Sequence, residues 1–101
     1  MAVDLSCYAL ALPDDAEATL LSLSASNREI FSRKFVISKV REANSIHKEI
    51  ALEYGMHAKS FFMISLNEKS AANLVLQVVD LIKGAFGEGR VIVVHGNEQL
   101  M

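Results

Sequence analysis

The chain has 101 residues, the size of one domain over 1–101, with no room for a second. Apolar residues make up 51% of it and the net charge is -2, so the whole molecule does not attract nucleic acid or anionic lipid. The single cysteine cannot form an internal disulfide, and no apolar run reaches the about 18 residues of a membrane span. These features predict a cytoplasmic protein with neither a nucleic-acid nor a membrane partner.

The first predicted elements are a strand and a helix. In an extended chain over 3–12, successive side chains point to opposite sides, and both sides are mostly apolar. This pattern predicts a strand that is moderately buried on both faces, and Pro13 stops it. Asp14, with Glu17 three residues later, resembles a capping box. A helix is therefore predicted over 14–34, with a break at the serine-rich stretch near its middle.

The next segment can be interpreted in two ways. Residues 35–39 are a short apolar run that suits either a buried strand or the entry to the next helix, and we favour the strand. Apolar residues then recur at three- and four-residue spacing and predict a helix over 40–54, which Gly55 closes.

The last part of the chain forms a strand, helix and strand unit. Residues 60–66 and 90–95 are strands that are apolar on both faces, and 68–86 has helical spacing between them. Strands of this kind are typical of a parallel sheet covered by helices. We therefore predict an α/β fold with a small, mostly parallel sheet of three or four strands.

A parallel arrangement would place several polar residues at one edge of the sheet, where open α/β sheets hold ligands. This alternative ligand crevice would consist of Asn67, Lys69, Ser70, His95 and Asn97. The asparagine and serine after the first strand are equally well explained as helix caps, and a histidine at a strand end is often a surface residue.

No residue pattern indicates catalysis or metal binding. His47 and His57 are ten positions apart, so they are not the two ligands that one helical face supplies to zinc. Cys7 has no neighbouring base, and the glycine-rich stretch 84–89 follows a helix, whereas phosphate loops follow a strand. We predict no catalytic residue, no metal and no cofactor, and hence no enzyme.

Charge is distributed unevenly along the chain. The first 17 residues carry acids and no base, whereas 28–48 is mostly basic. The basic segment lacks interleaved aromatic residues, so nucleic-acid binding is not favoured.

The run Lys59–Ala72, together with the size and composition of the chain, resembles small immunity proteins of bacterial contact-dependent growth inhibition and related toxin systems. Such proteins bind and neutralise a cognate toxin domain, frequently a nuclease, inside the cell that makes them. The resemblance assigns no functional residue.

If the resemblance holds, acidic groups would occlude a basic toxin site. The candidates are Asp14, Asp15, Glu17, Glu42, Glu49 and Glu53. Two alternatives stay open: a small-ligand or enzymatic domain that uses the strand-edge crevice, and a homo-oligomeric structural subunit, such as a homodimer, that uses the surplus apolar surface.

Overall fold

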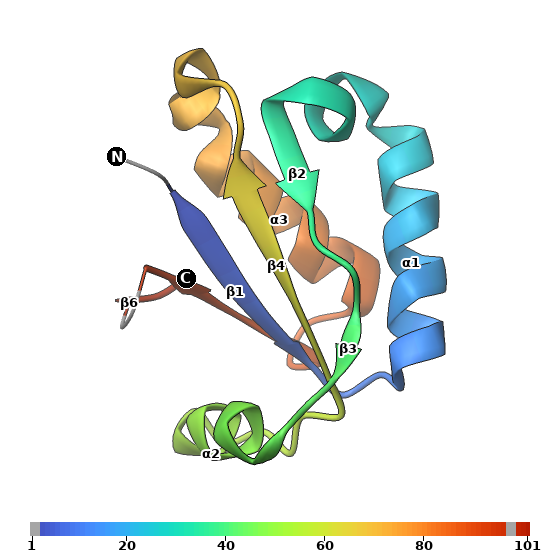
Figure 1. Ribbon diagram of the computed structural model, residues 1–101, viewed down its shortest axis with the longest axis vertical. Coiled ribbons are helices and arrows are strands. Elements are labelled where there is room, and N and C mark those ends of the chain that lie inside the picture. Colours follow the sequence, from blue (N-terminus) through green and yellow to red (C-terminus); the bar gives the residue numbers. More distant parts are fainter. Residues whose placement is uncertain (1–2, 97–98) are drawn as a thin grey trace.

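The computed structural model, which describes residues 3–96 and 99–101, contains one β-sheet with helices packed on it (Figure 1). In chain order the elements are β1 (Asp4–Ala9), α1 (Pro13–Ser26), the π-helix η1 (Ile30–Lys34), β2 (Phe35–Ile37), β3 (Arg41–Glu42), α2 (Ser45–Glu53), β4 (Ser60–Leu66), the 3-10 helix η2 (Lys69–Leu74), α3 (Val75–Phe86), β5 (Val91–His95) and β6 (Gln99–Leu100). The strand order is β2-β4-β1-β5-β6, and β3 also pairs with β4.

The predicted mostly parallel sheet is wrong, because every strand pair is antiparallel. The β4-α3-β5 unit forms, and its two strands run in the same direction. However, β1 lies between them and is antiparallel to both, with Leu5 opposite Ile64 on one side and His95 on the other. An apolar run on both faces indicates a central strand, but it does not specify the direction of its neighbours.

Parts of two helix predictions also need correction. The helix predicted over 14–34 has the expected break, because α1 ends at Ser26 and η1 follows over Ile30–Lys34. At the break the backbone and side-chain N–H groups of Asn27 both donate to the Leu23 carbonyl at 3.0 Å. The capping box at the start of α1 is absent, because the N-cap is Leu12 and Pro13 occupies the first turn. The helix predicted over 40–54 starts only at Ser45, since β3 takes the preceding residues.

The residues 35–37 are extended, as favoured from the sequence, but the edge strand is interrupted. The N–H of Ser38 donates to the Met63 carbonyl at 2.8 Å, and the next paired residues are Arg41 and Phe61. Lys39 and Val40 therefore lie opposite the single residue Phe62 of β4, and this two-to-one arrangement is a β-bulge. A short, bulged edge with basic side chains resists pairing with a further strand.

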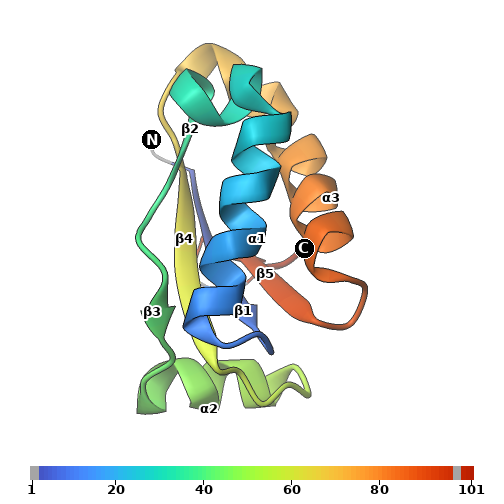
Figure 2. The same cartoon turned by 90° about the vertical axis from the view of Figure 1, so that its right-hand side faces the viewer.

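The two faces of the sheet are covered unequally (Figure 2). Helices α1 and α3 pack on one face through Leu20, Leu23, Val78, Val79 and Ile82, above a core of β-strand residues such as Cys7 and Phe62. The opposite face has a second cluster, which includes Tyr8, Ala51, Met56 and Ile92, at the end where α2 lies. No helix in the described part of the chain could span a membrane.

Candidate partner-binding surface

The six carboxylates predicted to bind a partner all reach solvent. They are Asp14, Asp15 and Glu17 on α1, Glu42 on β3, and Glu49 and Glu53 on α2, and every one is exposed. None of them has an ion-pair partner among the described residues. The ion pair seen there joins Arg33 Nε to Glu68 Oε1 at 3.6 Å. Both ribbon views place the start of α1, β3 and α2 toward the same end of the molecule.

That end is mixed in sign. Arg41 adjoins Glu42 on β3, Lys48 adjoins Glu49 on α2, and Lys59 precedes β4; all three basic residues are exposed. The carboxylates therefore form part of a charged surface with both signs, not a uniformly acidic patch. The position of Asp14 and Asp15 in the first turn of α1 also has a structural explanation, because the helix dipole favours anions there.

Helix α2 exposes two of its three large aliphatic side chains, while Ile50 is partly buried against the second cluster. Ile46 is 62% exposed and Leu52 is 54% exposed, whereas Ala51 is fully buried. The sequence did not predict this surface, because the apolar spacing over 40–54 places Ile46 on the same side of the helix as the core residues. The structure places Ala51, Ile50 and His47 on the covered side of α2, which leaves Ile46 in solvent. The short helix therefore carries apolar surface that its own core does not use.

A histidine fixes α2 to the sheet. The Asn44 N–H donates to His47 Nδ1 at 3.2 Å, and the His47 N–H donates to Asn44 Oδ1 at 2.8 Å, which completes a capping box. The imidazole stacks on Phe61 with ring centroids 3.8 Å apart. It also makes a T-shaped contact with Tyr8, with ring centroids 6.1 Å apart. Burial of the ring, and then the positive charge of Arg41, lower the pKa of His47.

This arrangement gives His47 a structural role. Its Nδ1 accepts a hydrogen bond, so the neutral ring carries its proton on Nε2. The signal in the sequence was the Asn44-x-x-His47 spacing, which is that of a capping box with histidine in place of the usual glutamate. His47 therefore orients α2.

The strand-edge crevice is only partly assembled. The ends of β4 and β5 lie at the same end of the sheet, but the start of β1 separates them, because Asp4 pairs with Ser65 and its carbonyl accepts from the Gly96 N–H at 3.1 Å. The side-chain amide of Asn67 already makes a hydrogen bond within the protein, because its Nδ2 donates to the Arg33 carbonyl at 2.8 Å. Among the remaining members, Lys69 and Ser70 are exposed, His95 is half-buried, and Asn97 lies outside the described residues.

A more pronounced hollow lies elsewhere, between α1 and the bulged edge. It has a volume of about 490 Å³ and is lined by residues that include Leu20, Leu21, Phe31, Val36, Ile37 and Val40. Its lining contains Glu17 and Lys39 as charged groups. The hollow is an open groove, and its lining offers no catalytic pair.

Reactive and metal-binding groups are not brought together. Cys7 is fully buried in the core, and this burial raises the pKa of its thiol, which favours the unreactive protonated form. No three histidine, cysteine or acidic side chains in the described part of the chain are grouped to hold a metal ion.

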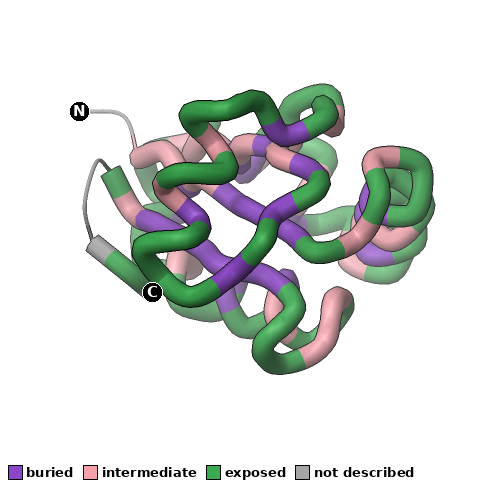
Figure 3. Tube along the Cα trace, turned by 90° about the horizontal axis from the view of Figure 1, so that it is seen from below, coloured by how far each residue is buried: buried purple, intermediate pink, exposed green. Residues whose placement is uncertain are grey.

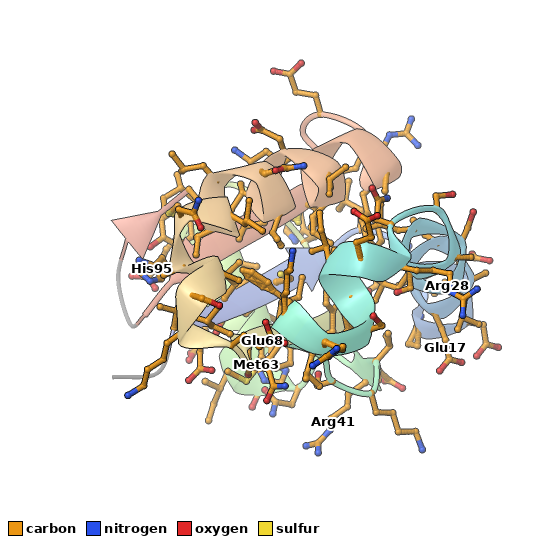
Figure 4. The ribbon with its side chains drawn as sticks, turned by 90° about the horizontal axis from the view of Figure 1, so that it is seen from above. Glu17, Arg28, Arg41, Met63, Glu68 and His95 are labelled. Atoms are coloured by element: carbon orange, nitrogen blue, oxygen red, sulfur yellow. The ribbon has the colours of Figure 1, made fainter. Side chains whose placement is uncertain are left out.

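The basic segment 28–48 does not form a single patch. Its residues extend from the end of α1 through η1 and β3 to α2. Figure 4 shows Arg28 beside α1 and Arg41 projecting in a different direction, with His95 on the far side of the molecule. Phosphate backbones are bound by clustered cations, so this spread gives no support to a nucleic-acid site.

Comparison with known proteins decides the family. The family model described as "CDI System Immunity Component" matches residues 1–99. The chain belongs to this family. The immunity protein CdiI-2 of Burkholderia pseudomallei strain 1026b is 40% identical over 98 residues, which are 97% of each protein. A chain in the CdiA-CT/CdiI toxin and immunity complex from Burkholderia pseudomallei superposes with a TM-score of 0.94 at 38% identity, over 97% of this chain and 95% of that one.

The family predicted from Lys59–Ala72 and the overall composition is thus confirmed. For a CDI immunity component, the relevant feature is an exposed surface for a partner. The family match therefore favours the immunity interpretation over the ligand-binding and structural-subunit alternatives, and it directs attention to the free carboxylates and to α2.

Proposed function

We propose that this CDI immunity component binds a cognate toxin domain in the cytoplasm and neutralises it by covering its active site, and that this toxin is a nuclease. The observation that carries the proposal is the superposition, with a TM-score of 0.94 over 97% of the chain, on a protein from a toxin and immunity complex. A backbone this similar offers a partner the same scaffold.

The unpaired carboxylates on this mixed-charge surface support a nuclease as the partner. A nuclease binds a polyanion, so its substrate site carries basic side chains. Unpaired carboxylates can occupy the positions of the phosphates and also accelerate encounter through attraction of opposite charges. The six candidates Asp14, Asp15, Glu17, Glu42, Glu49 and Glu53 supply such groups.

The size of the molecule fits a one-sided complex. A typical specific interface covers about 800 Å² on each partner. The accessible surface of the chain is 6306 Å², so such an interface would take roughly an eighth of it. We propose that the end that carries α2, β3 and the start of α1 provides this interface.

The proposal can be tested with the toxin domain encoded beside the gene for this chain. Co-expression should restore growth to cells that produce the toxin, and the purified chain should stop cleavage of nucleic acid at a one-to-one ratio. A CDI toxin domain from an unrelated system serves as the control and should remain active. A toxin that cleaves nucleic acid equally well with the chain in excess would contradict the proposal.

A further inference from the structure

We infer that the outward face of α2 is the centre of the toxin-binding surface, with Ile46 and Leu52 as apolar anchors on either side of Glu49. This inference rests on the proposed function and assigns a location to it. The occupant is the basic surface of the cognate toxin domain.

The first argument is the distribution of apolar surface within α2. A short helix on a small domain normally turns its largest aliphatic side chains toward the core. Here Ala51 is buried while Ile46 and Leu52 are more than half exposed. Figure 3 views the molecule from the end that carries α2, and the helix is exposed there except at His47, Ile50 and Ala51. The exposed apolar area is therefore available to a partner.

The second argument is the geometry of this face. Residues 46, 49 and 52 follow one another at three-residue spacing, so their side chains are neighbours along the outer side of the helix, and Glu53 lies on the same side. An acid flanked by aliphatic anchors is complementary to a basic surface that also offers apolar contact. Glu49 and Glu53 have no ion-pair partner among the described residues and can accept such a contact.

The third argument is the hollow beside the helix. A depression of about 380 Å³ is lined by Leu52 and Ala58 together with Lys48, Glu49, His57 and Lys59. It has the volume to admit a side chain of the partner next to the Leu52 anchor. The face thus combines a projecting aliphatic group at Ile46 with a recess at Leu52, as the centres of specific interfaces do.

The fourth argument is that α2 is held in place before binding. The Asn44–His47 capping box and the stack of His47 on Phe61 fix its start. The N–H groups of Met56 and Gly55 bond back to Ala51 and Leu52 at 3.0 and 2.9 Å and fix its end. Anchors on a fixed element lose little freedom on binding, which favours affinity.

Two other exposed leucines provide controls. Leu21 on α1 is 67% exposed and Leu76 on α3 is 68% exposed, so both are more exposed than Ile46 and Leu52. Both lie on helices that pack against the other face of the sheet. A single exposed leucine is ordinary in a soluble protein and needs no partner.

The test compares Ile46→Ala, Leu52→Ala and the double variant with Leu21→Ala and Leu76→Ala. Alanine favours helix formation, so all the variants should fold. Binding to the purified toxin domain is measured by isothermal titration calorimetry, and thermal melting checks the fold. We expect a loss of about tenfold for each anchor and about a hundredfold for the double variant, against less than about threefold for the controls.

Two results would overturn the inference. One is a double variant that binds within about threefold of the unchanged chain, and the other is an equal loss in the Leu21 or Leu76 variant. Either result would leave the proposed function standing, with its surface elsewhere. An unchanged chain that fails to bind the toxin at all would instead remove the proposed function and this inference with it.

Discussion

At the scale of single residues, His47 shows how an ionisable side chain can serve structure alone. Its Nδ1 closes the capping box with Asn44, and its ring lies 3.8 Å from that of Phe61. A histidine in a toxin-binding protein invites a functional interpretation. Here the hydrogen bond to Asn44 and the stacking on Phe61 show that His47 holds the start of α2 in place.

Replacing His47 should therefore destabilise the fold. We expect His47→Ala to lower the free energy of unfolding by about 1–2 kcal/mol, because it removes a cap and an aromatic contact. Urea unfolding monitored by circular dichroism measures the change. The exposed His57 is the control, and His57→Ala should stay within about 0.5 kcal/mol of the unchanged chain. Equal losses in the two variants would refute the structural role of His47.

The lowered pKa of His47 also predicts a pH dependence. The unfolded chain has the ordinary pKa of about 6.5 and the folded chain a lower one, so the unfolded state binds more protons just below pH 6.5. The contribution of neutral His47 to the free energy of unfolding is complete above pH 6.5, and it is lost as the pH falls toward the folded-state pKa.

The measurement is the urea midpoint of the unchanged chain and of His47→Ala at several pH values between about 7.5 and 5.5. The difference between the two should shrink as the pH falls, because protonation removes the Nδ1 acceptor that the variant already lacks. A difference that stays constant over this range would show that the imidazole does not titrate differently in the two states.

At the scale of elements, the first turn of α1 and the outer face of α2 are separable parts of the charged surface. Asp14, Asp15 and Glu17 lie on α1 without exposed aliphatic anchors between them, whereas Glu49 lies between Ile46 and Leu52. Charges at the rim of an interface act mainly on the association rate, while anchors at its centre act on dissociation.

Reversal of the three α1 charges to lysine should therefore slow association with the toxin domain. We expect a loss of affinity of about three- to tenfold, mostly in the association rate and smaller at high salt. Surface plasmon resonance at two salt concentrations measures both rates. Unchanged association at low salt would remove the α1 turn from the toxin-binding surface.

The matched control reverses three exposed acids away from this turn, namely Glu29, Asp80 and Glu88. It changes the net charge by the same amount, so any effect shared by the two triple variants comes from overall charge. Only the excess loss in the α1 variant reports on the location of the surface. The free energy of unfolding is compared as well, because the α1 acids also interact with the helix dipole.

At the scale of the whole molecule, β1 joins the parts of the fold. It occupies the centre of the sheet between β4 and β5, and its side chains contribute to the cores on both faces, Cys7 to one and Tyr8 to the other. It pairs with both strands of the β4-α3-β5 unit and so connects them in the sheet. The stability of the domain should therefore depend strongly on the residues of β1.

A polar atom at Cys7 tests this dependence. Cys7→Ser places a hydroxyl at a fully buried position and should cost about 1–3 kcal/mol of unfolding free energy, more than Cys7→Ala, which adds no polar atom. Urea unfolding gives both values. Affinity for the toxin domain should be retained under conditions where the variant is folded. A serine variant as stable as the alanine variant would contradict the buried, apolar setting of β1.

Local patterns in the sequence predicted several elements, but they did not determine where each element starts or which of its sides is buried. The segment 60–95 forms the expected strand, helix and strand because its apolar runs and helical spacing are long, although the predicted helix begins as the 3-10 helix η2 before α3. The apolar spacing over 40–54 misplaced Ile46, because the covered side of α2 is formed by Ala51, Ile50 and His47. The exposed face of α2 therefore could not be read from apolar spacing alone.

By itself, the sequence determined the high apolar content, the main strand and helix unit, a set of candidate acids and the resemblance to the family. The tertiary structure decided the antiparallel sheet, the insertion of β1 between β4 and β5, and the outward orientation of Ile46 and Leu52. The physical reason is that strand direction and helix rotation depend on partners distant in the chain, whereas composition and period are local properties.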